Sequence, residues 1–313
     1  MRKPLASIQV DCDSFWTLEE FWGLPETVRP RSLYAIALPR FLELFHACGV
    51  RATFFVVGRD LRDPAHVASL AEAVAEGHEI ANHSMRHRVG FGRLGPAQQA
   101  LEIEEADAII RTSLGVTPVG FRAPGFSVGG AALEVLARRG YLYDASVLPS
   151  LCNPLASWFH RWRGRPRRVP RSDWGGWRVM LAPREPYYPD ALAVWRRGAD
   201  RGLIELPLAV TRVARLPFYG NAHLGRGFRT FPRGLAGFEA GPLNYLWHLV
   251  ELASSEEIGA SLWRHPHASR TLEHKRDRCR AILEALADRF ELVPAREVAG
   301  AWRAAQPARV AGP

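Results

Sequence analysis

The chain has 313 residues, of which 47% are hydrophobic and 23% are charged, close to the averages of globular proteins. This composition excludes a disordered or collagen-like chain. The four cysteines are widely scattered, which excludes a disulfide-stapled scaffold and indicates reduced thiols. The formal charge of +9 permits an anionic partner without identifying one. We find no secretory signal and no transmembrane segment, so we expect a cytoplasmic protein, soluble or bound peripherally to the inner membrane.

Strand and helix patterns alternate along the first half of the chain. Strands are predicted at Ala6–Val10, Ala52–Val57, Glu79–Asn82 and Val119–Phe121, and helices at Ser32–Cys48, Ala65–Glu76, Pro96–Leu114 and Ala131–Arg139. Strands separated by long helices pair in parallel, so an α/β barrel or a doubly wound sheet is expected.

The second half of the chain is less regular. Residues 150–202 are rich in Trp, Pro and Arg and read as an insertion. Beyond it we predict strands at Leu203–Val210, Ser261–Trp263 and Phe290–Leu292 and helices at 243–255 and 271–288. We expect a single domain over residues 1–300, followed by a disordered tail at 303–313.

Two clusters of polar residues are typical of a metal site. His83 and His87 are spaced i, i+4, which would place both imidazoles on one face of a helical turn after a strand. Asp11 and Asp13 follow the first strand and would face one space, where one could bind a metal and the other act as a base. The alternatives are two unrelated surface histidines and a pair of solvated acids.

Two further signals lie at strand ends. Arg122, followed by Pro124, closes a strand and needs a carboxylate partner, for which Asp144 at the next strand end is a candidate. A structural salt bridge is the simpler explanation of Arg122. His265 precedes a proline and is expected to be extended, where it could be a general acid or a plain loop histidine.

The order of these motifs resembles the polysaccharide deacetylase family, also called carbohydrate esterase family 4 or the NodB homology domain. The paired acids, His-Ser-x-x-His, Arg-x-Pro, an acidic motif and a late histidine occur in that family's order, and GHEIANHSMRH and ATFFVVG are also similar. The resemblance implies a distorted, partly open β/α barrel of about seven strands. It also implies a divalent metal, most often Zn²⁺, on Asp13, His83 and His87.

The resemblance implies the remaining roles as well. Asp11 would be the general base held by Arg122, His265 the general acid, and Asp144 a support for Arg122 or His265. The acids are Asp-x-Asp rather than adjacent, which is similar to the intracellular branch of the family. Gly125 replaces an aromatic residue after Arg-x-Pro, but its backbone N–H could still bind the oxyanion.

The insertion holds a basic, aromatic segment. Residues 158–178 contain seven arginines, one acid and four tryptophans. Because Trp stacks on sugars and Arg binds phosphate, we expect Trp174, Arg167 and Arg168 to bind a phosphate-bearing acceptor, with a membrane surface as a further partner. The alternative is a solvated arginine-rich loop.

The sequence thus predicts a metal-dependent hydrolase that removes an N-acetyl or N-formyl group from an amino sugar, linked to a nucleotide, a lipid or an oligosaccharide. The alternative on the same barrel is a non-catalytic protein that binds glycans or polyanions. Nucleic-acid binding is not expected, because the sequence contains none of the usual recognition modules.

Overall fold

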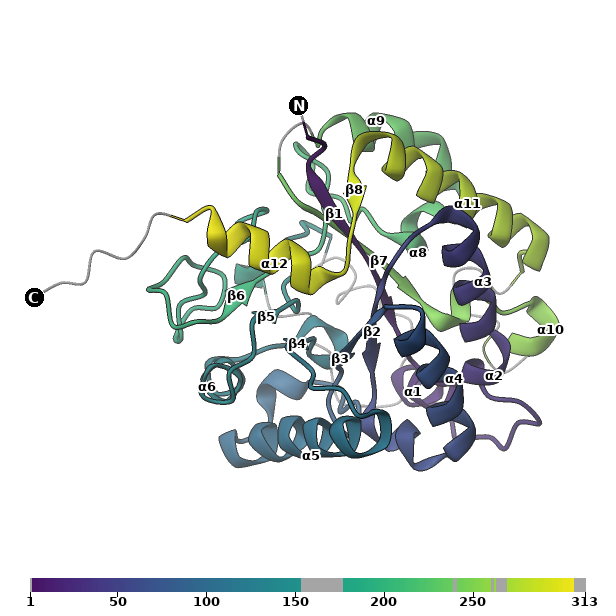
Figure 1. Cartoon of the computed structure of the whole chain (residues 1–313), viewed down its shortest axis with the longest axis horizontal. Coiled ribbons are helices and arrows are strands. Elements are labelled where there is room, and N and C mark those ends of the chain that lie inside the picture. Colours follow the sequence, from purple (N-terminus) through teal and green to yellow (C-terminus); the bar gives the residue numbers. More distant parts are fainter. Residues whose placement is uncertain (1, 153–176, 239–240, 260–261, 263–268, 307–313) are drawn as a thin grey trace, which may run out of the picture.

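The computed structural model describes the chain except residues 1, 153–176, 239–240, 260–261, 263–268 and 307–313. Within the described residues, eight parallel strands form one curled sheet: β1 (Leu5–Asp11), β2 (Thr53–Val56), β3 (Glu79–Asn82), β4 (Gly120–Phe121), β5 (Tyr143–Asp144), β6 (Ile204–Glu205), β7 (Leu243–His248) and β8 (Glu291–Leu292). Seven follow the order β6-β5-β4-β3-β2-β1-β7, and β8 pairs with β1 (Figure 1). This architecture confirms the predicted, partly open β/α barrel of about seven strands.

The two edges of the curled sheet approach each other without forming a ladder. The Ala209 N–H, just beyond β6, donates to the Asn244 carbonyl on β7 at 3.1 Å. The Asn244 side chain in turn donates to the Pro207 carbonyl at 2.9 Å. These bonds bridge the gap between β6 and β7, so the barrel is distorted and open only in part.

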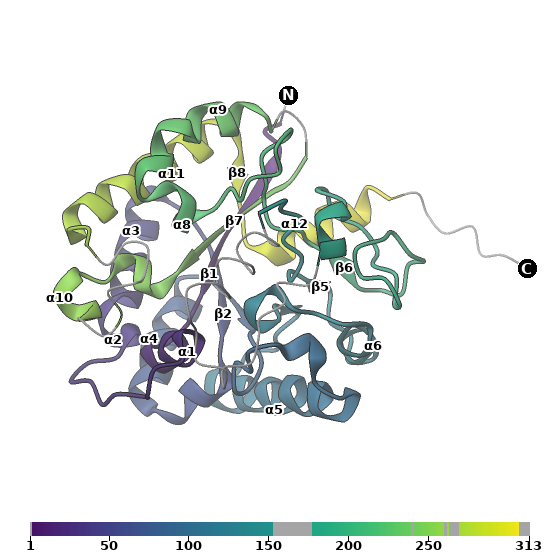
Figure 2. The same cartoon turned by 180° about the vertical axis from the view of Figure 1, so that it is seen from behind.

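Helices surround the outside of the sheet (Figures 1 and 2). They are α1 (Phe15–Trp22), α2 (Leu33–Ile36), α3 (Leu38–Cys48), α4 (Pro64–Ala75), α5 (Pro96–Leu114), α6 (Gly130–Arg138), α8 (Gly220–His223), α9 (Phe231–Ala236), α10 (Ser255–Ile258), α11 (Leu272–Arg289) and α12 (Ala295–Ala304). Short 3₁₀ helices lie at Gly58–Arg62, Phe91–Arg93, Pro124–Phe126, Trp177–Leu181, Arg226–Thr230 and Leu249–Leu252. Local signals fix several boundaries: Asp63 caps α4 ahead of Pro64, and Gly115 ends α5 with a left-handed backbone.

The first strand carries apolar residues on its outer face and polar residues on its inner face. In β1, Ala6, Ile8 and Val10 pack in the core beneath the helices, whereas Ser7 and Gln9 join a polar network inside the barrel. This alternation places Asp11, the last residue of β1, at the carboxyl end of the barrel interior.

The other end of the barrel is closed by α12. The buried Glu79 carboxylate accepts hydrogen bonds from the Thr53 hydroxyl, the Tyr143 hydroxyl and the Arg296 N–H at the start of the helix. Val298 and Ala299 of α12 pack against the interior apolar residues. Solvent is therefore kept from the amino end, and the opposite, carboxyl end is the one that can open to a ligand.

Several predicted elements differ from the structure. The helix expected at 243–255 is strand β7 followed by a 3₁₀ turn and the start of α10. The run is apolar at every spacing because β7 is buried on both faces, so it lacks the period-two signal of a half-exposed strand. The single helix expected at Ser32–Cys48 is two helices, α2 and α3, and the strand at Leu203–Val210 is regular only over β6.

The insertion and the tail are partly outside the described residues. Of the predicted insertion, residues 177–202 pack onto the barrel: Val179, Ala182 and Val194 join a core cluster with residues of α6, and Tyr187 bridges Glu205 of β6. The predicted tail begins inside α12, which continues to Ala304. The strand predicted at Ser261–Trp263 falls almost wholly outside the described residues.

Candidate metal and catalytic site

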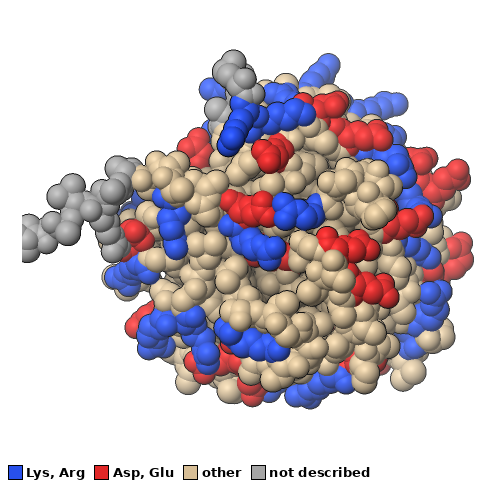
Figure 3. All heavy atoms as spheres, in the orientation of Figure 1, with Lys and Arg blue, Asp and Glu red and all other residues tan. Residues whose placement is uncertain are grey.

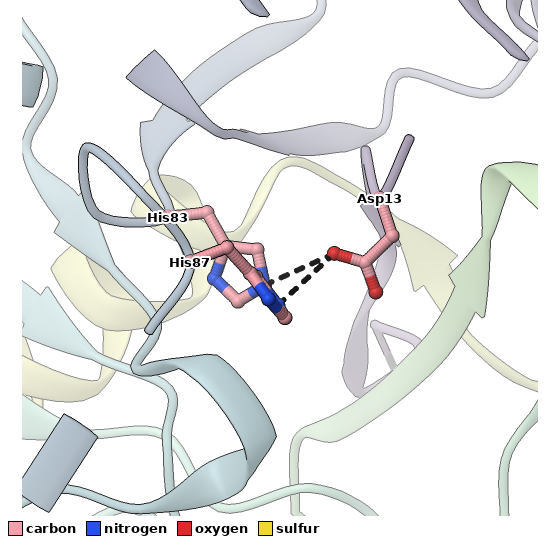
Figure 4. A group of neighbouring side chains, drawn as sticks. All are labelled: Asp13, His83 and His87. Carbon is pink, nitrogen blue, oxygen red and sulfur yellow. Dashed lines mark ion pairs between the residues drawn. The ribbon is translucent and has the colours of Figure 1, made fainter. Parts of the chain in front are cut away.

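Three predicted ligands converge at the carboxyl ends of β1 and β3. The Asp13 Oδ1 atom lies 3.2 Å from His87 Nε2 and 3.7 Å from His83 Nε2. Figure 4 shows both imidazoles pointing at this carboxylate. Ligand atoms of all three residues lie within 4.8 Å of one another, and all three side chains are buried.

The two histidines are not on a helical turn, and that expectation was wrong. Residues 83–87 form an irregular turn in which Ser84 (φ 64°) and His87 (φ 46°) have left-handed backbones. The Ser84 hydroxyl accepts from the His87 N–H at 3.1 Å, and the Ser84 N–H donates to Asn82 Oδ1 at 2.8 Å. Such strained conformations persist where the surroundings hold them, as at functional sites. Here the turn brings the two rings to 4.9 Å between centroids.

The surroundings of the three ligands suit a cation. The His83 Nδ1–H donates to the Arg122 carbonyl at 2.7 Å, which leaves the Nε2 lone pair facing Asp13. Burial lowers the pKa of His87 to about 4, so this imidazole is neutral and can donate a lone pair. Asp13 Oδ1 is buried and accepts no hydrogen bond. Two neutral imidazoles and one carboxylate form a donor set suited to Zn²⁺ or a similar divalent cation.

Asp11 is held beside this set by Arg122. The Arg122 Nη1–H donates to Asp11 Oδ1 at 2.5 Å, Nη2 donates to Gln9 Oε1, and Nε donates to the Ala145 carbonyl at 2.9 Å. Burial raises the pKa of Asp11, but Arg122, His83 and His248 together lower it below its usual value. The structure therefore keeps Asp11 ionised and fixes its orientation.

Asp144 does not pair with Arg122, and that candidate pairing was wrong. Asp144 instead accepts from the Ser146 hydroxyl at 2.5 Å and lies beside the Glu205 carboxyl. Burial raises the pKa of Asp144 to about 6 and raises that of Glu205 well above its usual value. Two buried carboxyls of this kind share one proton, and both lie within the electrostatic influence of the Arg122 guanidinium.

A histidine that the sequence analysis missed completes the site. His248 ends β7, and its Nε2 lies 3.9 Å from Asp11 Oδ2, the same distance that separates His83 Nε2 from that oxygen. Its side chain is 16% exposed, compared with 2% for His83. The sequence carries no clear signal for His248, because β7 is buried on both faces and its run is similar to a helix.

A buried carboxylate orients His248. The His248 Nδ1–H donates to Glu251 Oε1 at 3.3 Å, while Glu251 Oε2 has no hydrogen-bond partner. The buried Lys275 ammonium faces Glu251 and donates to the Ala253 carbonyl at 2.6 Å. Burial lowers the pKa of His248, but the hydrogen bond and charge of Glu251, with Asp11 and Asp13, raise it to about 9. His248 is thus a cation at neutral pH.

The carboxylate has little room to move. A Cβ at Gly220 would lie 2.2 Å from Glu251 Oε2 and 2.0 Å from Trp247 Cδ1. Only a glycine fits between these side chains, so the packing holds Glu251 against His248.

Of the remaining predicted site residues, the structure describes Gly125 alone. Gly125 lies in the 3₁₀ turn after β4 with φ 61°, next to Ala123 and Pro124, at the same edge of the sheet. His265, Trp174, Arg167 and Arg168 lie outside the described residues.

The fold and the site together define a barrel in which two histidines and one carboxylate could hold a cation beside Asp11 and His248. Residues 34–143 match the polysaccharide deacetylase family model. A chitin deacetylase of Pestalotiopsis sp. is 31% identical over 101 residues, which cover 32% of this chain and 34% of that protein. The chain therefore resembles the polysaccharide deacetylase family over about a third of its length, as the sequence motifs predicted. It spans about a third of the length of the curated relatives it matches.

Solved structures extend the comparison to the whole fold. A Mycobacterium smegmatis protein described as a polysaccharide deacetylase has a TM-score of 0.57 at 16% identity, covering 99% of this chain and 95% of that one. An allantoinase has a TM-score of 0.60 at 15% identity, covering 97% and 92%. At these identities the likeness shows the fold and not the substrate.

Proposed function

We propose that this protein is a divalent-metal-dependent hydrolase that removes an N-acyl group, acetyl or formyl, from an amino sugar. The observation that carries the proposal is the placing of Asp11 and His248 beside the buried Asp13, His83 and His87. The match of residues 34–143 to a deacetylase family model supports the class of reaction. Zn²⁺ is the proposed metal, although Fe²⁺, Co²⁺ and Mn²⁺ also suit this donor set.

Each side chain has a role that follows from its environment. Asp13, His83 and His87 would hold the cation, which when bound polarises the acyl carbonyl and acidifies water. Asp11, ionised and fixed by Arg122, is placed to accept a proton as the general base. The Gly125 N–H is proposed as a donor to the oxyanion.

Release of the amine needs a proton, because a free amide anion is a very poor leaving group. His248 is protonated at neutral pH and is the most exposed side chain of the site. We therefore assign the general acid to His248, with Glu251 holding its Nδ1–H. His265, the general acid expected from the sequence, remains a candidate for this role, and paired variants of His248 and His265 can distinguish the two.

The finer substrate class remains a prediction from the sequence. The arginines at 165, 167 and 168 suit a phosphate-bearing acceptor, such as a diphosphate-linked amino sugar. Reversing these three charges should raise KM for a phosphorylated substrate and leave KM for an uncharged substrate unchanged.

The cytoplasmic location of the protein also stays a prediction. In the described residues no helix is both long and apolar enough to span a membrane.

Nucleic acid is a poor candidate partner on the visible surface. The face in Figure 3 carries basic and acidic side chains side by side rather than one continuous basic stripe.

The test is release of acetate or formate, measured by mass spectrometry, from a panel of N-acylated amino sugars that are free, nucleotide-linked or lipid-linked. Allantoin is tested beside the panel for ring-opening hydrolysis, because an allantoinase shares the fold. The Zn²⁺-loaded protein should release acyl groups, and the Asp13→Ala variant should not. Binding of a glycan from the panel with no acyl release would instead support the non-catalytic alternative.

A further inference from the structure

Three segments of the chain meet on the surface of the protein. They are residues 148–152, 177–184 and 210–217, here called the apolar-basic surface. The Leu151 N–H donates to the Arg215 carbonyl at 3.3 Å. The Arg215 guanidinium donates to the carbonyls of Met180 and Ala182. Arg184 donates to the Arg212 carbonyl at 3.1 Å, so the three segments form one continuous surface.

This surface concentrates exposed apolar side chains. Among the described residues, five of the eight exposed large hydrophobic residues belong to it: Leu151, Trp177, Leu181, Val213 and Leu216. Val213 is 91% exposed, Leu181 66% and Trp177 60%. Scattered apolar residues on a surface are ordinary, but a group of this kind marks an interaction site.

The charge between these apolar side chains has one sign. The three segments contain Arg178, Arg184, Arg212 and Arg215 and no acidic residue. The Arg178 guanidinium lies 5.4 Å from the ring centroids of both Trp177 and Trp195, which holds it among the apolar residues. A partner that accepts this surface must bind apolar side chains and cations together.

The surface is connected to the candidate site. Leu148 and Val210 pack in one buried cluster with Phe126 and Leu246. Phe126 is the neighbour of Gly125, and Leu246 lies two residues before His248. This buried cluster therefore links the apolar-basic surface to the chain segments that carry Gly125 and His248.

We propose that the apolar-basic surface docks the protein onto an anionic lipid bilayer, and that the substrate is an N-acylated amino sugar carried by a membrane lipid. The second part rests on the proposed function; the docking does not. Apolar side chains that protrude separately, with arginines between them, suit insertion among lipid headgroups. Each arginine adds attraction to anionic lipid, and the whole chain carries +9.

Vesicle co-sedimentation of the full chain tests the docking. Wild-type protein should sediment with vesicles of phosphatidylcholine and phosphatidylglycerol in equal parts and stay in solution with phosphatidylcholine alone. The Leu181→Ser/Val213→Ser variant should bind the anionic vesicles at least about tenfold more weakly, because two inserted apolar side chains are lost. The Arg178→Glu/Arg212→Glu variant should bind more weakly and with less dependence on salt.

A matched control variant is available elsewhere on the surface. Val28 and Leu192 are 103% and 94% exposed and lie outside the three segments. Val28→Ser/Leu192→Ser should bind vesicles as the wild type does. Equal binding by the Leu181→Ser/Val213→Ser variant and the wild type overturns the proposal. So does wild-type protein that stays in solution with both kinds of vesicle, which would leave a protein as the partner.

The failure of the docking and that of the proposed function can be told apart. Hydrolysis of a soluble N-acylated amino sugar should be unchanged in the Leu181→Ser/Val213→Ser variant, while hydrolysis of a lipid-linked one in anionic vesicles should fall. Vesicle binding without any acyl release would overturn the proposed function and keep the docking. Acyl release with no vesicle binding would overturn the docking and keep the proposed function.

Discussion

His248 and Glu251 form a buried, charge-assisted pair, with 3.3 Å between His248 Nδ1 and Glu251 Oε1. The pair fixes which imidazole nitrogen faces the site, because the nitrogen bonded to Glu251 cannot turn toward Asp11. It also ties the charge of His248 to a carboxylate that has no contact with solvent. The predictions about proton transfer depend on this relationship.

Removing the carboxylate should change the pH dependence of the reaction. In wild type, kcat/KM should fall as the pH rises through about 9, where His248 loses its proton, and a bound cation should move this fall to lower pH. Glu251→Gln removes the charge that raises the pKa of His248, so the fall should occur at clearly lower pH. An unchanged profile would mean that His248 is not the acid or that Glu251 does not act on it.

The same pair should affect stability in a defined pH range. The folded-state pKa of His248, about 9, lies above the ordinary value of 6.5. Its protonation therefore stabilises the fold fully below about pH 6.5, and this contribution is lost as the pH rises through about 9. Denaturant unfolding of wild type and Glu251→Gln across this range should give curves that converge at high pH. A constant difference would contradict the assignment.

The two candidate acids can be separated by paired variants. His248→Ala should lower kcat by about 10²–10⁴-fold, the usual contribution of a general acid, and keep the bound metal. His265→Ala should leave kcat near wild type. The difference should shrink for a substrate with a good leaving group, which needs no protonation. A large loss with His265→Ala and none with His248→Ala would reverse the assignment.

Single substitutions should distinguish the three proposed metal ligands from the proposed general base, Asp11. Asp13→Ala, His83→Ala and His87→Ala should each lose bound Zn²⁺, measured by elemental analysis after dialysis. His46→Ala is the control, because His46 is exposed at the end of α3. Metal retained by all three ligand variants would show that the triad does not hold the cation.

Asp11→Asn should instead keep Zn²⁺ and lose about 10²–10⁴-fold in kcat, because it removes the base and leaves the ligands. Arg122 keeps an oxygen to bond, so the protein should remain folded, which a thermal melt can verify. Loss of metal from Asp11→Asn, with metal retained by Asp13→Asn, would exchange the two roles.

Sequence patterns predicted the parts of the molecule that depend on local order. The strands before residue 150, the helices α4, α5 and α11, and the converging Asp13, His83 and His87 all follow from short motifs with fixed spacing. The turn at 83–87 was not predictable, since its left-handed Ser84 is held by hydrogen bonds to Asn82 and His87.

Residues brought in by long-range pairing were harder to find. His248 meets Asp11 only because β7 pairs with β1 in register, Asp11 opposite His248. Lys275 of α11 acts on Glu251 through its charge, and Gln9 binds Arg122 from the middle of an apolar run. These interactions depend on how distant segments of the chain are placed in the fold, so they cannot be predicted from composition or periodicity.

The position of β1 has a consequence for biosynthesis. This strand pairs with β2, β7 and β8, so one of its edges stays unpaired until residues 243–248 and 291–292 have been synthesised. During translation the ribosome releases this largely apolar strand long before β7 and β8 exist to cover that edge. Contacts between segments so far apart in sequence form slowly, and open strand edges promote aggregation. The nascent chain is therefore expected to need a chaperone until its last quarter has emerged, and slower translation of the early part would give no benefit.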